Sequence, residues 1–305
     1  MAGQGGEGSQ SRVLPDRVRQ VLSRVQDMPT VSTVLADVAE ATSDPEVSAR
    51  AVAEIIARDQ ALTMRLLRIV NSAFYGFRRR ISTVHDAAVI MGTTALRAAV
   101  LGASVFESLR GSADDDEAYE TLRQHSAEAA EATRALAARY GYREPGEAHV
   151  AGLLHDVGKL VIRLQFPEEY AAIVAHQQSS RLPAVVAERK YLGATHTEIG
   201  GWVAEMWQRP ATRRAALLYH HEPGAARENS LLVALVHLGD VVAHTAAGMA
   251  GRASASPPIS ASGWAVLSAR RSDIQQEEIR AFAEELIGAW DRVQALAYGL
   301  SAAAG

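Results

Sequence analysis

Apolar residues recur every three or four positions along most of this chain, which is the spacing that places side chains on one face of an α-helix. Val18, Leu22 and Val25 show the pattern near the start of the sequence. No segment between the prolines shows the sustained alternation of apolar and polar residues that is typical of a strand. Ala, Leu and Arg are abundant, whereas aromatic residues make up only 6% of the chain. The sequence therefore predicts an all-α fold.

Length and charge narrow the class of protein further. The 305 residues, 48% of them hydrophobic, are sufficient to bury one large core or two modest ones. A net charge of −4 does not supply the long-range attraction needed for general binding to nucleic acid or to a membrane surface. The apolar stretch 87–106 is interrupted by Arg97 and is too short to span a bilayer. With no cysteine and no recognisable signal segment, we expect a cytoplasmic protein without disulfides or thiolate metal sites.

Loops and linkers divide the chain into expected regions. The Gly- and Ser-rich start cannot bury enough surface to order itself, and the acidic run 114–117 is typical of a solvated linker. We expect the chain to end with a closing amphipathic helix at 273–297 that packs on the same molecule. The expected regions are 1–12, a disordered tail; 13–110, an N-terminal helical bundle; 118–250, a second helical bundle; 251–262, a loop; and 263–305, a C-terminal helical extension.

His155 and Asp156 are adjacent in the segment AGLLHDVGKL, where an apolar helical run carries two groups that can bind a metal. An imidazole nitrogen and a carboxylate oxygen together suit divalent transition metals. The dipeptide alone is weak evidence, because a role at a helix N-terminus or in a salt bridge explains it equally well. Lys159 follows at a distance that allows either contact with a substrate phosphate or an ion pair with a nearby carboxylate.

Further residues of the same chemical types lie inside or at the ends of apolar helices. They are His125, which we expect to open a helix, His196, His220, His221 and Asp240. Burying these groups without partners costs several kcal/mol, so each needs one. A shared centre holding a divalent metal such as Fe or Mn would satisfy all of them, with the carboxylates offsetting its charge and the imidazoles neutral.

The remaining histidines fit surface or packing roles better. His237 and His244 are the exceptions, because they stand three residues before and four residues after Asp240 on the same expected helix. Either imidazole could orient that carboxylate.

The order His125, His155-Asp156, Asp240 resembles the H…HD…D signature of the HD superfamily of metal-dependent phosphohydrolases. His196 and the pair His220-His221 resemble its HD-GYP branch of cyclic-dinucleotide phosphodiesterases. After YHHEP, however, the chain lacks the DGxGYP loop of that branch.

A longer resemblance is to the HDOD domain, a hydrolase-related output domain of bacterial signalling proteins. It covers roughly 14–225, and its most specific segments are NSAFYG and GLLHDVGKL. The other segments are MPTV, DPEVS, IIARDQALTMRLLRIV, ISTVHDAAVIMG, THTEIGGWVAEMW and YHHEP. The resemblance implies two helical subdomains and a regulatory role, mostly without demonstrated hydrolysis. This sequence nevertheless keeps every candidate ligand.

Three functions follow as hypotheses. In the first, the chain is a regulatory module without catalysis that binds a signalling protein, with or without a nucleotide ligand. In the second, it is a metal-dependent phosphohydrolase with the seven His and Asp residues as ligands and Lys159 at the substrate phosphate. In the third, those residues form a buried hydrogen-bonded network that only stabilises the bundle. No specific partner can be named from the sequence.

Overall fold

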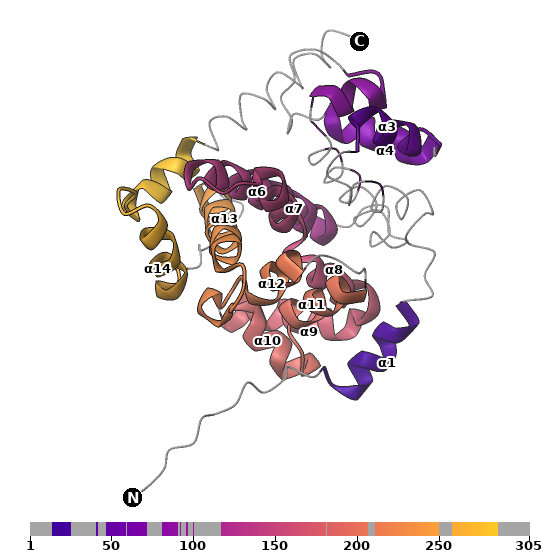
Figure 1. Cartoon of the computed structure of the whole chain (residues 1–305). Helices are drawn as coiled ribbons and strands as arrows, with labels where there is room; N and C mark the ends of the chain where they lie inside the picture. The colour runs from indigo at the N-terminus through magenta and orange to yellow at the C-terminus, as the bar shows by residue number, and fades with distance from the viewer. Residues whose placement is uncertain are drawn as a thin grey trace, which may run out of the picture.

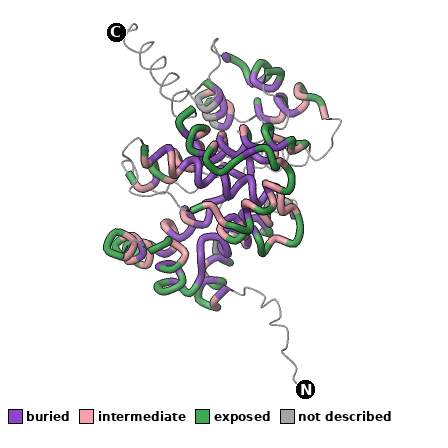
Figure 2. Tube along the Cα trace, turned by 90° about the vertical axis from the view of Figure 1, so that its left-hand side faces the viewer, coloured by how far each residue is buried: buried purple, intermediate pink, exposed green. Residues whose placement is uncertain are grey.

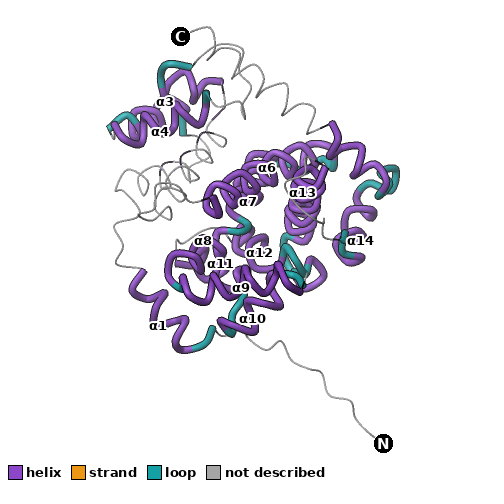
Figure 3. Tube along the Cα trace, turned by 180° about the vertical axis from the view of Figure 1, so that it is seen from behind, coloured by secondary structure: helices purple, strands orange, loops and turns teal. Residues whose placement is uncertain are grey.

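A computed structural model of the chain describes residues 14–25, 41, 47–58, 60–71, 81–90, 92, 96, 100, 117–180, 182–206, 211–249 and 258–285. All regular elements within these ranges are helices, which confirms the all-α prediction (Figures 1 and 3). The expected tail 1–12 and most of the expected loop 251–262 lie outside the described residues. Figure 2 shows that buried segments gather in the middle of the helical assembly and exposed segments at its periphery.

From residue 117 to residue 249 the helices follow one another along the chain with short connections. The bounds of all the described helices are α1 (Asp16–Val25), α3 (Ala49–Ile56), α4 (Gln60–Val70), α6 (Glu117–Arg139), α7 (Pro145–Leu154), α8 (Val157–Gln165), α9 (Pro167–Ser180), α10 (Ala184–Leu192), α11 (His196–Met206), α12 (Ala211–Tyr219), the 3₁₀ helix η1 (Pro223–Ala225), α13 (Ser230–Met249) and α14 (Ala261–Arg270). The expectation that His125 opens a helix was wrong, because α6 begins at Glu117 with acidic side chains in its first turn.

Helices α3 and α4 pack with the helical residues 84–90 into an apolar cluster of their own. Asn71, directly after α4, holds this part together: its side-chain amide donates to the carbonyls of Leu67 and Ile81 and accepts from the Ile81 N–H, each at 2.7 Å. In Figures 1 and 3, α3 and α4 lie apart from α6–α14.

Helix α1 belongs to a different cluster from α3 and α4. Its buried face, with Val18 and Leu22, and the preceding Leu14 pack into a cluster to which α8, α9, α10 and α11 contribute most of the residues. Figure 1 accordingly places α1 beside α9 and α11 and far from α3. The division into two subdomains at 110–118 stays a prediction.

Helices α6, α7 and α13 approach one another closely at small residues. A side chain at Gly239 of α13 would place its Cβ 2.1 Å from the Thr133 hydroxyl and 3.0 Å from the Thr133 backbone nitrogen. The Thr133 hydroxyl donates to the Ala129 carbonyl at 2.6 Å, so it turns back onto its own helix. This contact brings Asp240, the residue after Gly239, close to α6.

Gly158 sets the distance between α8 and α11. A Cβ at this position would lie 2.0 Å from the backbone oxygen of His196 and 2.9 Å from its Cα. Backbone atoms cannot move aside as a flexible side chain can, so only glycine fits between these helices. The glycine of the HDVGK segment therefore has a packing role.

We expect Gly158→Ala to destabilise the protein by about 1–3 kcal/mol or more, because the added methyl group forces α8 and α11 apart. Gly200→Ala is the matched control, since a Cβ there meets its neighbours at ordinary distances of 3.7 Å or more. In the control, alanine in place of a helical glycine adds about 0.5–1 kcal/mol of stability. Thermal or denaturant unfolding of the two variants tests the contrast, and equal midpoints would contradict it.

Helix α13 is the one described helix that is long and apolar enough to cross a membrane. The rest of the chain, however, buries 78% of its most apolar window. Such burial is typical of the central helix of a bundle. Its buried polar residues, His237 and Asp240, consequently face protein.

The C-terminal region packs on α6 and α13. Leu267 of α14, together with Ile274 and Ile279, is buried in the cluster that these helices form, and Phe282 packs against it. Arg271, directly after α14, also contacts the end of α6, where its guanidinium donates a hydrogen bond to the Arg139 carbonyl at 2.7 Å. The expected intramolecular packing is thus observed up to residue 285, and the end of the expected helix lies outside the described residues.

Candidate metal centre

The seven predicted ligands come together in the middle of the second helical region. They form two groups, within each of which the potential ligand atoms all lie within 4.8 Å of one another. One group consists of His125, His155 and Asp240, and the other of Asp156, His196, His220 and His221. Five structural units supply them: α6, the α7–α8 junction, α11, the residues directly after α12, and α13.

The α7–α8 junction presents two adjacent side chains to the centre. His155 ends α7 with helical dihedral angles (φ −53°, ψ −38°), and Asp156 precedes α8 with φ −99° and ψ 13°. The Asp156 carboxylate makes no capping hydrogen bond to the helix that it precedes. It is therefore available to the centre, where it is 2% exposed.

Asp156 faces both groups at once. Its Oδ2 lies 3.4 Å from His155 Nε2 and 3.7 Å from His125 Nε2. Its Oδ1 lies 3.2 Å from His196 Nε2 and 3.7 Å from His220 Nε2. One carboxylate thus offers a separate oxygen to each group, which is the arrangement that a bridging ligand between two metal ions requires.

Asp240 completes the first group from α13. Its Oδ1 lies 3.0 Å from His125 Nε2, 3.5 Å from His155 Nε2 and 3.4 Å from His244 Nε2. The expectation that His244 contacts this carboxylate is therefore met by the geometry. His237 instead uses its Nε2 to accept a hydrogen bond from the Ser260 N–H at 2.9 Å.

Backbone carbonyls orient two of the imidazoles. His155 Nδ1 lies 2.7 Å from the Gly152 oxygen, and His220 Nδ1 lies 3.0 Å from the Leu217 oxygen. A carbonyl only accepts, so each Nδ1 carries the proton and donates. In the neutral ring this leaves the Nε2 lone pair directed at the centre, as metal ligation needs.

Glu188 on α10 orients a third imidazole. Its carboxylate accepts from the His196 N–H and contacts His196 Nδ1, each at 2.8 Å. At its other nitrogen, His196 Nε2 lies 3.1 Å from His221 Nε2. Helix α11 begins at His196 because Thr195 and Glu198 cap it reciprocally, with the Thr195 N–H donating to Glu198 Oε2 at 2.9 Å.

Sequence reasoning missed Glu188. The residue stands eight positions before His196, in a run with Arg189 and Lys190 that is typical of an exposed helix face. Its side chain is nevertheless buried, at 3% exposure. An acidic residue near a candidate ligand was the only available signal, and many solvated residues share it.

We expect Glu188→Gln to weaken metal binding by ~10–100-fold, because the amide no longer favours the proton on His196 Nδ1. Glu205→Gln is the matched control, since Glu205 is on the neighbouring helix α11 with a side chain that is 69% exposed. Chelator competition measures both affinities. Equal affinities in the two variants would show that Glu188 has no orienting role.

At His155, Asp156 and Asp240, the attractions between opposite charges together shift the pKa values more than burial does. Burial raises the pKa of Asp156, but His155 and Lys159 outweigh it and hold that pKa well below its usual value. The pKa of Asp240 is lowered in the same way, with the neighbouring His125 and His155 outweighing burial. Burial lowers the pKa of His155, yet the Asp156 and Asp240 carboxylates outweigh it and raise the pKa to about 10.

Two imidazoles of the second group, His220 and His221, are held neutral. Burial lowers the pKa of His220 to about 4, and burial and the neighbouring histidines lower that of His221 as well. Both rings are therefore uncharged at neutral pH. Neutral imidazoles are the form that binds a metal.

Several polar atoms at the centre are buried without a hydrogen bond. Among the described residues these include His155 Nε2, His220 Nε2, Asp156 Oδ1, Asp240 Oδ1 and His125 Nε2. Buried polar atoms in native proteins nearly always have a partner. All five belong to the predicted ligand set, so the donor set and its orphaned atoms fit a bound divalent cation.

Lys159 is tied to the centre by an ion pair. Its Nζ lies 2.5 Å from Asp156 Oδ2, and its side chain keeps 19% of its surface exposed. The Asp156 carboxylate raises the Lys159 pKa against the lowering effect of burial. Its alternative role at a substrate phosphate stays a prediction.

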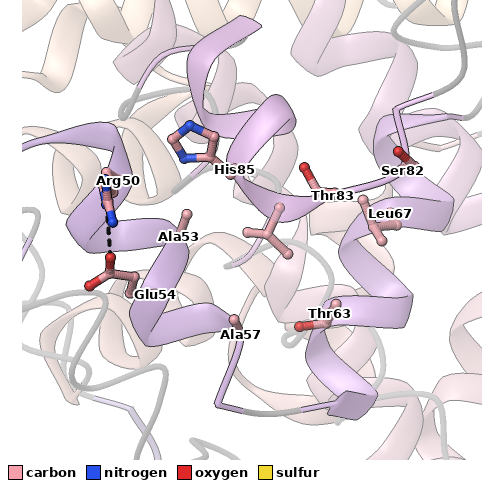
Figure 4. A pocket seen from close by; sticks show the side chains of 10 residues that line it. Arg50, Ala53, Glu54, Ala57, Thr63, Leu67, Ser82, Thr83 and His85 are labelled. Carbon is pink, nitrogen blue, oxygen red and sulfur yellow. Dashed lines mark hydrogen bonds and ion pairs between the residues drawn. The ribbon is translucent and has the colours of Figure 1, made fainter.

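A separate cavity of about 620 Å³ lies among the N-terminal helices. Figure 4 shows Arg50 and Glu54 of α3 paired at its edge, with Thr63 and Leu67 of α4 opposite His85. Its apolar lining consists of Ala53, Ala57, Leu67 and Val84. The ligand set of the metal centre lines no part of it.

Fold and site together define a helical bundle with a buried His/Asp centre. The chain belongs to the HDOD domain family, whose family model matches residues 28–223. An uncharacterized protein of Treponema pallidum (strain Nichols) is 26% identical over 217 residues, which are 71% of this chain and 42% of that protein. The chain thus spans less than half the length of this curated relative.

Solved structures show the same fold. An HDOD domain protein of unknown function from Geobacter sulfurreducens is 26% identical, with a TM-score of 0.73 over 90% of this chain and 96% of that chain. A candidate signal transduction protein from Marinobacter aquaeolei VT8 is 22% identical, with a TM-score of 0.75 over 92% of this chain and 61% of that one. A candidate phosphohydrolase from Shewanella amazonensis SB2B is 23% identical, with a TM-score of 0.68 over 90% and 96%.

Proposed function

We propose that this chain is a bacterial signalling protein with a two-metal centre that hydrolyses a phosphate ester. The observation that carries the proposal is Asp156, whose two oxygens face separate groups of imidazoles. A structural network would satisfy its own hydrogen bonds, whereas here the orphaned atoms converge on two points. The purely structural hypothesis is therefore disfavoured.

His125, His155 and Asp240 would hold one ion, and His196, His220 and His221 the other, with Asp156 shared between them. Mixed nitrogen and oxygen ligands favour Fe or Mn over a thiolate-preferring metal. Divalent ions in such a pair supply a nucleophile from water at neutral pH and offset charge that develops on a phosphoryl group. The protein itself contributes the fixed Nε2 directions, through Gly152, Leu217 and Glu188.

The exposed part of the Lys159 side chain would give a phosphate oxygen a cationic contact. The same Nζ stays within reach of Asp156 through the i,i+3 spacing on α8. Lys159 would therefore bind and orient the phosphate group while it remains paired with the carboxylate.

A second candidate function is a non-catalytic regulatory module that binds a signalling protein, with or without a nucleotide ligand. The observation that favours it is the close Lys159–Asp156 pair, which engages the cation otherwise available for a substrate. The segment after His221 also forms the short helix η1, at the place where a substrate-recognition loop is expected in HD-GYP enzymes. This module would keep a metal for ligand binding without turnover.

Elemental mass spectrometry of tag-free protein purified without chelators, from cells supplied with manganese and iron, tests the proposal. We expect about two equivalents of metal per chain and hydrolysis of bis(p-nitrophenyl) phosphate. Metal without hydrolysis of this ester or of cyclic dinucleotides would favour the regulatory module. A protein that takes up no metal would overturn the two-metal centre altogether.

A further inference from the structure

Residues 260–263, at the start of α14, contact two elements of the metal centre and are here called the α14 clasp. They lie beyond the family match, which ends at residue 223. The Ser260 N–H donates to His237 Nε2 on α13 at 2.9 Å. The Ser262 hydroxyl accepts from the Gly224 N–H of η1 at 3.1 Å.

The clasp is tightly packed as well as hydrogen-bonded. A Cβ at Gly263 would lie 3.1 Å from His237 Cδ2 and 3.2 Å from Pro223 Cγ. A Cβ at Gly224 would lie 2.8 Å from that of Ser262. The Ser260 hydroxyl caps α14 by accepting from the Gly263 N–H at 3.3 Å. The helix cap thus fixes the conformation of the residues that touch η1 and α13.

Both elements held by the clasp lead directly to predicted ligands. Helix η1 begins two residues after His221, and its Pro223 is buried. His237 precedes Asp240 by three residues on α13, and its side chain is 4% exposed. His221 and Asp240 belong to different groups of the centre. The clasp therefore spans the two halves of the site from outside it.

The Ser260 bond also determines the tautomer of His237. Because Nε2 accepts the backbone N–H, the proton of the neutral ring is on Nδ1. His237 Nδ1 is itself buried and has no hydrogen-bond partner among the described residues, so the Ser260 N–H is the contact that orients the ring. A side chain without an acceptor at this position would release Ser260 and leave its N–H without this partner.

We propose that the α14 clasp and His237 form a positioning device that holds the two halves of the metal centre at their working separation. Metal affinity then depends on a segment outside the family-matched region. The inference rests on the proposed metal centre and adds to it the residues that keep its two groups together.

Cobalt(II) binding tests this inference, with the visible absorption spectrum as a readout of coordination and chelator competition as a readout of affinity. We expect His237→Leu to weaken cobalt binding by ~10–100-fold and to change the spectrum, because the acceptor for Ser260 is lost. His237→Gln keeps an acceptor and is expected to recover most of the affinity. Ser268→Ala, an α14 substitution whose hydroxyl only returns to Ala265, is the matched control.

Ser262→Ala provides a second test that does not depend on the folding of the His237 variants. Ser262 is exposed, so the change removes the Gly224 contact without opening the core. We expect a few-fold weaker cobalt binding and a shifted spectrum. If the wild-type protein binds cobalt while His237→Leu or Ser262→Ala retains its affinity and spectrum, the clasp inference is overturned alone. If the wild-type protein binds no cobalt or other divalent metal, the proposed centre itself fails.

Discussion

Asp156→Asn is expected to lower metal affinity by more than ~100-fold and to abolish hydrolysis. The amide has nearly the shape of the carboxylate but presents only one oxygen, so one of the two imidazole groups loses its shared ligand. The substitution also removes the negative charge that offsets a bound cation. It leaves the positive charge of Lys159, whose Nζ is 2.5 Å from Asp156 Oδ2 in the wild-type protein, without its partner. Elemental analysis and chelator competition on the purified variant measure the loss.

The chain contains its own matched control for this change. His85 and Asp86 form a second His-Asp pair, but both side chains are exposed on the helical residues 84–90. Asp86→Asn makes the same carboxylate-to-amide change in a His-Asp pair that lies outside the metal centre. It should leave metal content and activity unchanged. Wild-type metal content in Asp156→Asn would contradict the bridging role, provided that circular dichroism shows both variants folded.

The contrast between these two pairs shows what the sequence can predict about the site. The apolar setting of His155-Asp156, in AGLLHDVGKL, indicated burial, and the structure places that pair at 0% and 2% exposure. The same reasoning found the other candidate ligands, because a polar residue inside an apolar helix needs a partner.

Glu188 shows where local pattern fails. It stands beside the charged residues Arg189 and Lys190, as a residue on an exposed helix face would. It is nevertheless buried against His196 of α11, which Gly158 allows to pack closely on α8. That close packing is a tertiary contact between residues far apart in the chain. Spacing within one helix carries no information about it.

Helix α1 gives the corresponding lesson for the fold. The apolar spacing of Val18 and Leu22 predicted a helix with one buried face. The pattern does not say which helices cover that face. Although α3 is the next described helix along the chain, α1 packs against α8–α11 instead. Periodicity predicts an element and its buried side, whereas its partner requires the assembled structure.

Metal binding is expected to strengthen with pH by ~10-fold per unit between about pH 6 and 8, with release of about one proton per chain. In the metal-free protein the pKa of His155 is raised to about 10, so this imidazole carries a proton throughout that range. Binding must displace the proton to free Nε2. His220, with its pKa lowered to about 4, is already neutral, and both carboxylates are already ionised, so these groups release nothing further.

The stability of the metal-free protein should change in the opposite direction. A raised folded-state pKa stabilises the protein fully below the unfolded value, and this contribution is lost as pH rises from about 6.5 towards 10. The thermal stabilisation on adding metal should therefore widen from pH 6 to pH 8. Isothermal titration in two buffers of different ionisation enthalpy counts the protons, with Asp156→Asn as the protein that should show little binding. A proton release of zero, with pH-independent affinity, would mean that His155 is not displaced and does not bind the metal.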